Sequence, residues 1–353
     1  MHALRTAAAA LALGALSLTA CADAQDALLR RIATRMAAPR TELYGDDAMR
    51  VLICGSASPL PHPTRARPCT AILAAGKIWV VDVGPGSWNH MGGWRIAGER
   101  IGAVLLTHFH SDHIGELGEW NLQTWVAGRP APLSVIGPEG VQSVVAGFNE
   151  AYALDRGYRV AHHGADFNVP ALGLMIPAPI AFPAGATSTV VHDADGLRIT
   201  AFLVDHRPIV PAVGYRFDWR GRSVVVSGDT VKSANLIAAA RDADVLVHEA
   251  QANHIVKILG EVAAANRPRA AKIMADIPSY HTTPVQAAEV ANEANVKLLV
   301  MSHLTPPPPN ALLARIFVRG VDDVRPSGWV LADDGMLITL PANSDAIEQS
   351  EID

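Results

Sequence analysis

The sequence predicts a mixed α/β fold for most of the chain. Strand-like apolar runs alternate with helical segments in the middle, and antiparallel hairpins are predicted near both ends, at 70–83 and 329–339. Polar side chains recur where predicted strands end, at Asp82, His108, His206, Asp229, His248 and His303. In layered α/β folds, ligand sites form at the carboxyl ends of strands, so we expect a functional site at a sheet edge.

The predicted strands are short apolar runs bounded by turn residues such as Gly76 and Gly221. In chain order they cover 51–55, 70–74, 78–83, 101–106, 133–137, 187–192, 197–205, 212–218, 223–227, 245–249, 297–301, 329–331 and 336–339. The predicted helices cover 117–127, 141–152 and 233–241, and a further helix begins at Thr282 or Thr283, either of which can cap it. Residues 153–186 are rich in Pro and Gly without a clear period, which predicts an irregular segment with a functional or mobile role.

The composition is that of a globular protein. Of 353 residues, 50% are hydrophobic and 18% are charged, enough for one large domain or two smaller ones. The formal net charge is -5, and lysine and arginine form no run. Because nucleic-acid binders usually present a basic face, this composition argues against a nucleic acid partner without excluding one.

The N-terminus has the character of an export signal. Arg5 precedes an uncharged small-apolar run, 6–20, which is too short to span a membrane. The run ends in Leu-Thr-Ala-Cys, which resembles a bacterial lipobox. We therefore expect residues 1–21 to be a signal peptide and the protein to reach the periplasm or outer membrane, held to the membrane through lipidated Cys21 only. Ordinary cleavage near Ala24 is the alternative.

The rest of the chain divides into three predicted parts. Residues 22–45 carry a short amphipathic stretch with arginines on its polar side and are interpreted as a tether or surface helix. Residues 46–342 form the folded domain. The tail 343–353 is acidic and is expected to fray.

Three features have two interpretations each. Cys54 and Cys69 lie on neighbouring predicted strands, where they form a disulfide or remain buried free thiols. Asp82 ends a strand, where it orients a metal-binding histidine or caps a turn. His162 and His163 lie in the irregular segment, at a pocket rim or on the plain surface.

The densest chemistry lies between Thr107 and Leu117. His108, His110, Asp112 and His113 follow a predicted buried strand and precede a helix. Neutral imidazole suits Zn, Fe, Ni or Cu, and a carboxylate extends the choice to Mn. A polar loop of otherwise satisfied histidines is the alternative, but burying several unpaired histidines without a metal would be costly.

The motifs taken together resemble the metallo-β-lactamase superfamily, and within it the ribonuclease Z and arylsulfatase-like branch. The resemblance covers about residues 50–340 and rests on the segments 81–86, 107–113, 204–206, 227–230, 247–250, 281–283 and 302–303. It implies an αββα sandwich, in which two mixed sheets are flanked by helices. It also implies two zinc ions per chain, with Mn or Fe compatible with the same ligands.

The resemblance also assigns roles to individual residues. One ion would be held by His108, His110 and His206, the other by Asp112, His113 and His303, and Asp229 would bridge both. Two cations roughly 4 Å apart can hold a bridging hydroxide, which Asp112 would help to orient. His281 would protonate the leaving oxygen, with Glu249 as its orienting partner. The alternative for His281 is a helix-capping histidine.

These features predict an exported metal-dependent hydrolase that uses a two-metal-bound hydroxide on a phosphodiester or sulfate ester of a small molecule. Ribonuclease Z enzymes are cytoplasmic and bind tRNA through an inserted basic arm, and no Gly- and Lys-rich arm is found in this sequence. A tRNA 3′-processing endoribonuclease and a lactonase or β-lactamase-like hydrolase are the alternative enzymes. A metal-stabilised envelope binding protein is the non-enzymatic alternative, and a homodimer is compatible with all of them.

Overall fold

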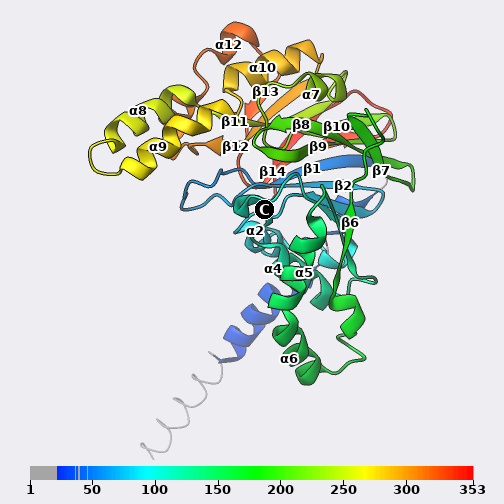
Figure 1. The fold of residues 1–353 in the computed structure, drawn as a ribbon. Helices are drawn as coiled ribbons and strands as arrows, with labels where there is room; N and C mark the ends of the chain where they lie inside the picture. The colour runs from blue at the N-terminus through cyan, green and yellow to red at the C-terminus, as the bar shows by residue number, and fades with distance from the viewer. Residues whose placement is uncertain (1–21, 36, 39, 46, 353) are drawn as a thin grey trace, which may run out of the picture. The chain divides into compact units, whose positions relative to one another are not determined.

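The computed structural model describes residues 22–35, 37–38, 40–45 and 47–352 (Figure 1). The chain divides into two compact units, Met1–Arg40 and Thr41–Asp353. In the first unit, residues 22–35 are helical and exposed to solvent. The predicted lipidation site, Cys21, lies outside the described residues. No helix within the described ranges is both long and apolar enough to cross a membrane.

The second unit is built on two mixed sheets. The eight strands of the first sheet lie in the order β15 (Glu348–Glu351), β14 (Met336–Pro341), β1 (Ala48–Gly55), β2 (Cys69–Ala74), β3 (Lys77–Val81), β4 (Ile101–Leu105), β5 (Leu133–Gly137) and β6 (Met175–Pro179). The seven strands of the second lie in the order β13 (Trp329–Leu331), β12 (Leu298–Thr305), β11 (Val245–Gln251), β10 (Arg222–Val226), β9 (Ile209–Trp219), β8 (Leu197–His206) and β7 (Ser188–Ala194).

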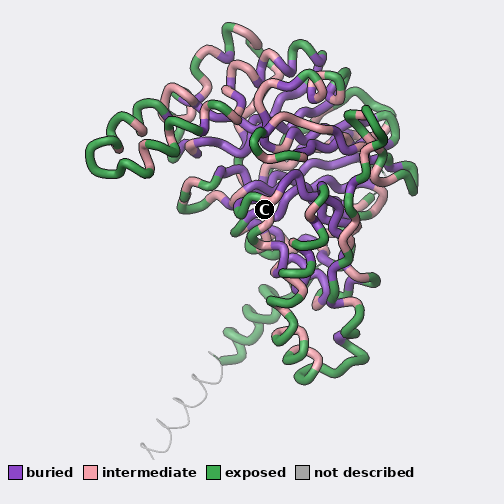
Figure 2. The backbone as a smooth tube through the Cα atoms, in the orientation of Figure 1, coloured by how far each residue is buried: buried purple, intermediate pink, exposed green. Residues whose placement is uncertain are grey.

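Four of the eight strands in the first sheet and four of the seven in the second are parallel, and polar residues that the sequence places at strand ends lie on or just after them, except His206, which ends antiparallel β8. Strands β3 to β6 run parallel to one another, and so do β10 to β13. Because parallel strands are covered on both faces, β11 and β12 are buried along their whole length. Their carboxyl ends therefore deliver polar side chains into a largely buried environment, which Figure 2 shows in purple.

The period-2 geometry of the strands separates the core into layers. In β1, Met49, Val51 and Ile53 face the core between the sheets, whereas Leu52 and Cys54 face the helices on the outside of the first sheet. Outer helices of the first sheet are α2 (Ser87–Gly93), α4 (Leu117–Val126) and α5 (Val141–Ala151). Those of the second are α7 (Ala234–Ala239), α10 (Pro284–Glu293), α11 (Ala311–Phe317) and α12 (Val321–Val324). The predicted αββα sandwich is thus confirmed.

Two helices project from the second sheet as a hairpin, α8 (Asn253–Ala263) and α9 (Pro268–Asp276), followed by the short η4 (Ile277–Ser279) (Figure 1). This hairpin connects the end of β11 to α10. The predicted start of α10 is confirmed at Thr283, whose side chain accepts a hydrogen bond from the Gln286 amide in a capping box.

The structure corrects two expectations. The segment 153–186 is not irregular throughout, since α6 (Ala153–His163), η3 (Pro170–Gly173) and β6 lie in it. No residue of α6 is buried, and Leu154 and Tyr158, which lie one turn apart on it, are exposed. His162 and His163 are exposed at its end. The acidic tail forms β15, which pairs with β14, because Ile352 is buried and anchors the chain end.

A disulfide joins Cys54 of β1 to Cys69 of β2, with their Cα atoms 4.9 Å apart, so the open question between bridge and free thiols is settled for the bridge. The loop it closes is also held by Asp334, from the turn before β14. One Asp334 carboxylate oxygen accepts a hydrogen bond from the Ser56 amide (2.9 Å) and the other from the Ala66 amide (2.6 Å). Both ends of the loop are therefore fixed to the sheet.

Candidate metal centre

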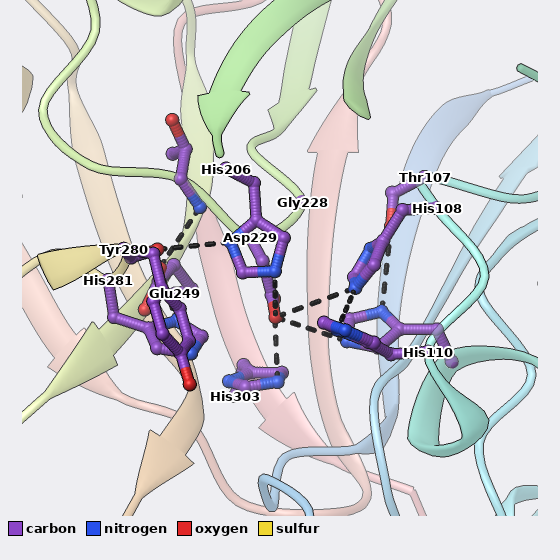
Figure 3. A network of polar contacts seen from close by, with 12 residues as sticks. Thr107, His108, His110, His206, Gly228, Asp229, Glu249, Tyr280, His281 and His303 are labelled. Carbon is purple, nitrogen blue, oxygen red and sulfur yellow. Dashed lines mark hydrogen bonds and ion pairs between the residues drawn. The ribbon is translucent and has the colours of Figure 1, made fainter. Parts of the chain in front are cut away.

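Seven side chains predicted as metal ligands converge at one end of the sandwich. Figure 3 labels five of them: His108, His110, His206, Asp229 and His303. His108 and His110 follow β4, and α3 (Ser111–Ile114) supplies Asp112 and His113 immediately afterwards. On the second sheet, His206 ends β8, Asp229 follows β10, and His303 lies near the end of β12. The carboxyl ends of strands from both sheets thus build the site, as the sequence predicts.

The side chains form two neighbouring groups. The ligand atoms of His108, His110, His206 and Asp229 lie within 4.8 Å of one another, and so do those of Asp112, His113 and His303. Asp229 lies between the groups. Its Oδ2 atom is 3.8 Å from His108 Nε2 and 3.4 Å from His113 Nε2, and its Oδ1 atom is 3.4 Å from His303 Nε2.

The donor atoms of this cluster fit a cation. Several are buried and have no hydrogen-bond partner among the described residues: Asp112 Oδ2, His113 Nε2, His206 Nε2, Asp229 Oδ1 and both ring nitrogens of His303. Leaving so many polar atoms unsatisfied would cost stability, whereas coordination to a metal would satisfy them together. His108 Nε2 and His110 Nδ1 are 2.9 Å apart, which also suits two ligands of one ion.

The ionisation of the cluster supports the same interpretation. Burial opposes the charged form of Asp229, but His303 and His113 outweigh it and hold the Asp229 pKa well below its usual value. Burial likewise disfavours the imidazolium of His113, but Asp229 and Asp82 raise the His113 pKa well above its usual value. In the metal-free chain the carboxylates thus hold protons on neighbouring imidazoles, and a cation would replace those protons.

Residues behind the ligands fix their orientation. Asp82 Oδ2 is 2.7 Å from His113 Nδ1, and the same carboxylate accepts hydrogen bonds from the Thr107 amide (2.9 Å) and hydroxyl (2.8 Å). Asp82 therefore makes the contacts that both interpretations require, one to a histidine and two to the loop. His206 Nδ1 is 3.0 Å from the Tyr280 carbonyl oxygen. In both His113 and His206 this contact uses Nδ1, so the other ring nitrogen, Nε2, remains available to coordinate a metal ion.

His281 lies beside the ligand groups and is paired with Glu249. His281 Nδ1 is 2.9 Å from Glu249 Oε1, and that oxygen also accepts a hydrogen bond from the Thr230 amide (3.0 Å). Burial disfavours the charged imidazole, but the charge and hydrogen bond of Glu249 outweigh it and raise the His281 pKa to about 9. The pair can therefore carry a proton next to the cluster. His281 is also within 4.8 Å of Asp229 and His303 ligand atoms.

The interior of the site is small, and its open side is formed by only a few residues. A cavity of about 30 Å³ borders Asp229, His303 and Glu249, which is room for about one water molecule and not for a substrate. His110 is exposed and His281 partly so. These two histidines therefore connect the cluster to the solvent-exposed surface.

One expected residue does not join the site, and two that were not expected support it. His248 is fully buried and lines the small cavity, but it belongs to neither ligand group, and its Nδ1 atom is 2.7 Å from the Glu249 carbonyl oxygen. Thr230 and Thr282 lie in motif segments, but their contacts with Glu249 were not predicted. The Thr282 hydroxyl donates to the Thr230 carbonyl (2.5 Å), and both threonine amides donate to Glu249. Their positions next to Asp229 and His281 are the only signal in the sequence.

Comparisons with known proteins agree with this geometry. The family model described as "Beta-lactamase superfamily domain" matches residues 80–304. A protein named ribonuclease Z from Mycobacterium avium is 37% identical over 261 residues, which cover 73% of this chain and 86% of the relative. The ribonuclease Z of Mycobacterium marinum is 38% identical and covers 73% and 87%.

Solved structures show the same fold at lower identity. The metallo-β-lactamase fold protein YhfI from Bacillus subtilis aligns with a TM-score of 0.58 and 18% identity over 83% of this chain and 99% of its own. The short form of human tRNase Z aligns with a TM-score of 0.57 and 20% identity over 83% and 99%. The chain is therefore a hydrolase of the metallo-β-lactamase superfamily and belongs there with the relatives named ribonuclease Z.

Proposed function

We propose that this protein is a metal-dependent phosphodiesterase whose substrate is RNA. The observation that carries the proposal is the His281–Glu249 pair beside two groups of metal-ligand side chains. A phosphodiester needs charge neutralisation on its non-bridging oxygens and a proton on its leaving oxygen, and the site offers groups for both.

In this proposal the ligand groups would hold two zinc ions, one through His108, His110 and His206 and one through Asp112, His113 and His303, and Asp229 could serve either ion. When bound, such ions would lower the pKa of water and neutralise charge on the phosphate. Asp112 orients the attacking water, and His281 donates a proton to the leaving oxygen while Glu249 holds its ring. His110 and His281 border the side from which the substrate enters.

RNA as the substrate is supported by the relatives. Those named ribonuclease Z match over 73% of this chain, and the family model spans residues 80–304, which include every proposed ligand and the His281–Glu249 pair. Because the formal net charge is -5, electrostatic attraction to RNA would have to come from charges near the site and not from the protein surface as a whole. This proposal differs from the expectation of a small-molecule ester substrate, which the export signal, the net charge and the missing basic arm favour.

A substrate panel tests the proposal. Zinc-loaded protein should hydrolyse bis(p-nitrophenyl) phosphate and cleave a precursor tRNA near its 3′ end, and it should leave p-nitrophenyl sulfate and lactones largely intact. The His108→Ala variant should lose activity on all substrates. Full activity of that variant would contradict the metal assignment, whereas turnover of the sulfate ester without cleavage of RNA would contradict the substrate assignment.

A second candidate is an exported hydrolase of small phosphodiesters or sulfate esters. It is favoured by the lipobox-like sequence that ends at Cys21 and by the Cys54–Cys69 disulfide, because such bridges persist in oxidising compartments. We propose a reporter fused after residue 30 as the test. Export of an active periplasmic reporter with lipid on Cys21 would favour this candidate over RNA processing in the cytoplasm, and a reporter retained in the cytoplasm would remove it.

A further inference from the structure

Tyr280 places an aromatic ring beside the metal centre (Figure 3). It lies between η4 and α10 and directly precedes His281 in the chain. The centroid of its ring is 4.9 Å from that of the His281 ring and 5.4 Å from that of the His206 ring. Tyr280 therefore touches both a proposed metal ligand and the proposed proton donor, although neither role uses the Tyr280 side chain.

The backbone of Tyr280 is fixed by hydrogen bonds that do not involve its side chain. Its amide donates to the Ile277 carbonyl oxygen (3.3 Å), and its carbonyl oxygen is 3.0 Å from His206 Nδ1. A substitution of the Tyr280 side chain can therefore remove the ring and keep the contact that orients His206.

The contacts of Tyr280 are not those of a tyrosine that stabilises the fold. Tyr215 is such a residue, because it is fully buried in the core and its hydroxyl donates to the Leu106 carbonyl oxygen (2.7 Å). Tyr280 is only partly buried, belongs to none of the three apolar clusters, and its hydroxyl has no hydrogen-bond partner among the described residues. Part of its side chain therefore remains available to a ligand.

Tyr280 is also the ring at this site that has no other task. Among the described residues, the rings that contact the ligand histidines belong to other histidines and to Tyr280. His110 and His281, which are likewise accessible, have proposed roles as a metal ligand and as the proton donor. An aromatic face at an accessible site is a surface on which a nucleobase can stack.

The position of His281 indicates which nucleobase would meet this ring. If His281 protonates the leaving oxygen, the nucleoside that carries this oxygen must lie beside His281. The Tyr280 ring lies against His281, so it is next to the same nucleoside. Bases of single-stranded RNA are free to stack on aromatic side chains, and stacking does not require a positively charged surface, which suits a net charge of -5.

We infer that Tyr280 is a specificity-determining residue, whose ring stacks against the base of the nucleotide that carries the leaving oxygen. The inference rests on the proposed function, because it requires an RNA substrate and His281 as the proton donor. It explains how a protein without a basic arm selects RNA, since a phosphodiester that lacks a base at this position forgoes the contact.

Steady-state cleavage of three RNAs by the zinc-loaded full-length protein tests the inference. The chemical ends of the products identify the nucleotide that carries the leaving oxygen; a 3′-hydroxyl end places it on the 5′ side of the cleaved bond. The three substrates are a precursor tRNA, the same RNA without the base of that nucleotide, and a control RNA without the base on the other side of the bond.

The Tyr280→Leu variant should raise KM for the intact RNA about tenfold, the loss expected for one stacked base, with kcat and zinc content close to those of wild type. It should show the same loss on the control RNA, and it should match wild type on the RNA that lacks the stacking base. Tyr280→Phe keeps the ring and should retain the wild-type KM. Tyr158→Leu removes an exposed tyrosine of α6 and serves as the matched control without effect.

Two results would overturn the inference alone. These are a wild-type KM of Tyr280→Leu on the intact RNA, and an equal loss on the intact RNA and on the RNA that lacks the stacking base. If Tyr280→Leu fails to fold, wild type still decides, because equal KM values for these two RNAs would also overturn it. Failure of wild type to cleave any of the RNAs would contradict the proposed function and this inference with it.

Discussion

At the scale of single residues, the metal centre contains two kinds of side chain. Some have buried polar atoms that lack a partner without a cation, and others would act on a substrate. Buried, unpartnered atoms on His206, Asp229 and His303 belong to the first kind. His281, held by Glu249 at 2.9 Å, belongs to the second. The two kinds predict different phenotypes, because loss of a ligand removes the metal and loss of a proton donor leaves the metal in place.

Substitution of His281 separates these phenotypes. If His281 protonates the leaving oxygen, His281→Ala should slow hydrolysis of an RNA linkage by about 10²–10⁴-fold. It should slow bis(p-nitrophenyl) phosphate hydrolysis much less, because p-nitrophenolate leaves without a proton. Metal content should be unchanged. Equal losses on both substrates together with a loss of metal would show instead that His281 is a ligand, as its place near Asp229 and His303 also permits.

Asp82 allows a test of whether residues that hold the ligands in place contribute to metal affinity. The Asp82→Asn substitution exchanges a carboxylate that accepts from His113 and Thr107 for an amide of the same shape. We expect metal affinity to fall about 10–100-fold, the usual cost of losing such a partner, with a smaller effect on the fold. Competition with a chelating dye measures the change. Unaltered affinity would show that Asp82 acts only as a cap for the loop.

At the scale of elements, the strands were predictable and some of the helices were not. Apolar runs such as Ile101–Leu105 and Val245–Gln251 have the composition of buried parallel strands, so their positions follow from the sequence. Helix α6 has apolar residues one turn apart, Leu154 and Tyr158, but buries neither, and it lies in a segment rich in Gly and Pro. Strand β15 is acidic and exposed, and it pairs with β14, a contact that no local window of the sequence contains.

The capping box of α10 can be measured on its own. Thr283 begins the helix that follows His281, and its side chain accepts a hydrogen bond from the Gln286 amide. Thr283→Ala should lower the free energy of unfolding by about 1 kcal/mol, a typical cost for a lost N-cap. Urea denaturation measures this loss. Thr283→Ser keeps the acceptor oxygen and should restore most of the stability, and equal effects of the two substitutions would contradict a capping role.

The turn before β14 predicts a pH dependence of stability. A hydrogen bond to Asp334 raises the pKa of half-buried His90 above its usual value, with Nδ1 and Oδ2 3.2 Å apart. A raised histidine pKa contributes stability below the unfolded-state value of about 6.5, and that contribution is lost as pH rises through the folded-state pKa. Wild type should therefore exceed His90→Gln in stability by at most about 1 kcal/mol at pH 5.5 and by less at pH 9. A constant difference across this range would contradict the ion pair.

At the scale of the whole molecule, the seven ligand-type residues could be predicted because each lies at the end of a strand or in a short motif. The contacts of Thr230 and Thr282 with Glu249 could not be predicted, because they depend on how distant segments of the chain lie together in the fold. Likewise, only the fold places the Tyr280 ring beside His206. The sequence favours a small-molecule ester because of its export signal, its net charge and its missing basic arm, whereas the relatives named ribonuclease Z support the proposal of RNA. Net charge describes the whole surface and not the site.

The central claim is that two metal ions, held by groups that share Asp229, support phosphodiester hydrolysis. The most direct measurement titrates zinc into chelator-treated protein and follows bis(p-nitrophenyl) phosphate hydrolysis. The account predicts negligible activity without metal and full activity at about two equivalents per chain, as expected for a two-metal site. Full activity in the metal-free protein, or saturation at one equivalent with no second site, would contradict it.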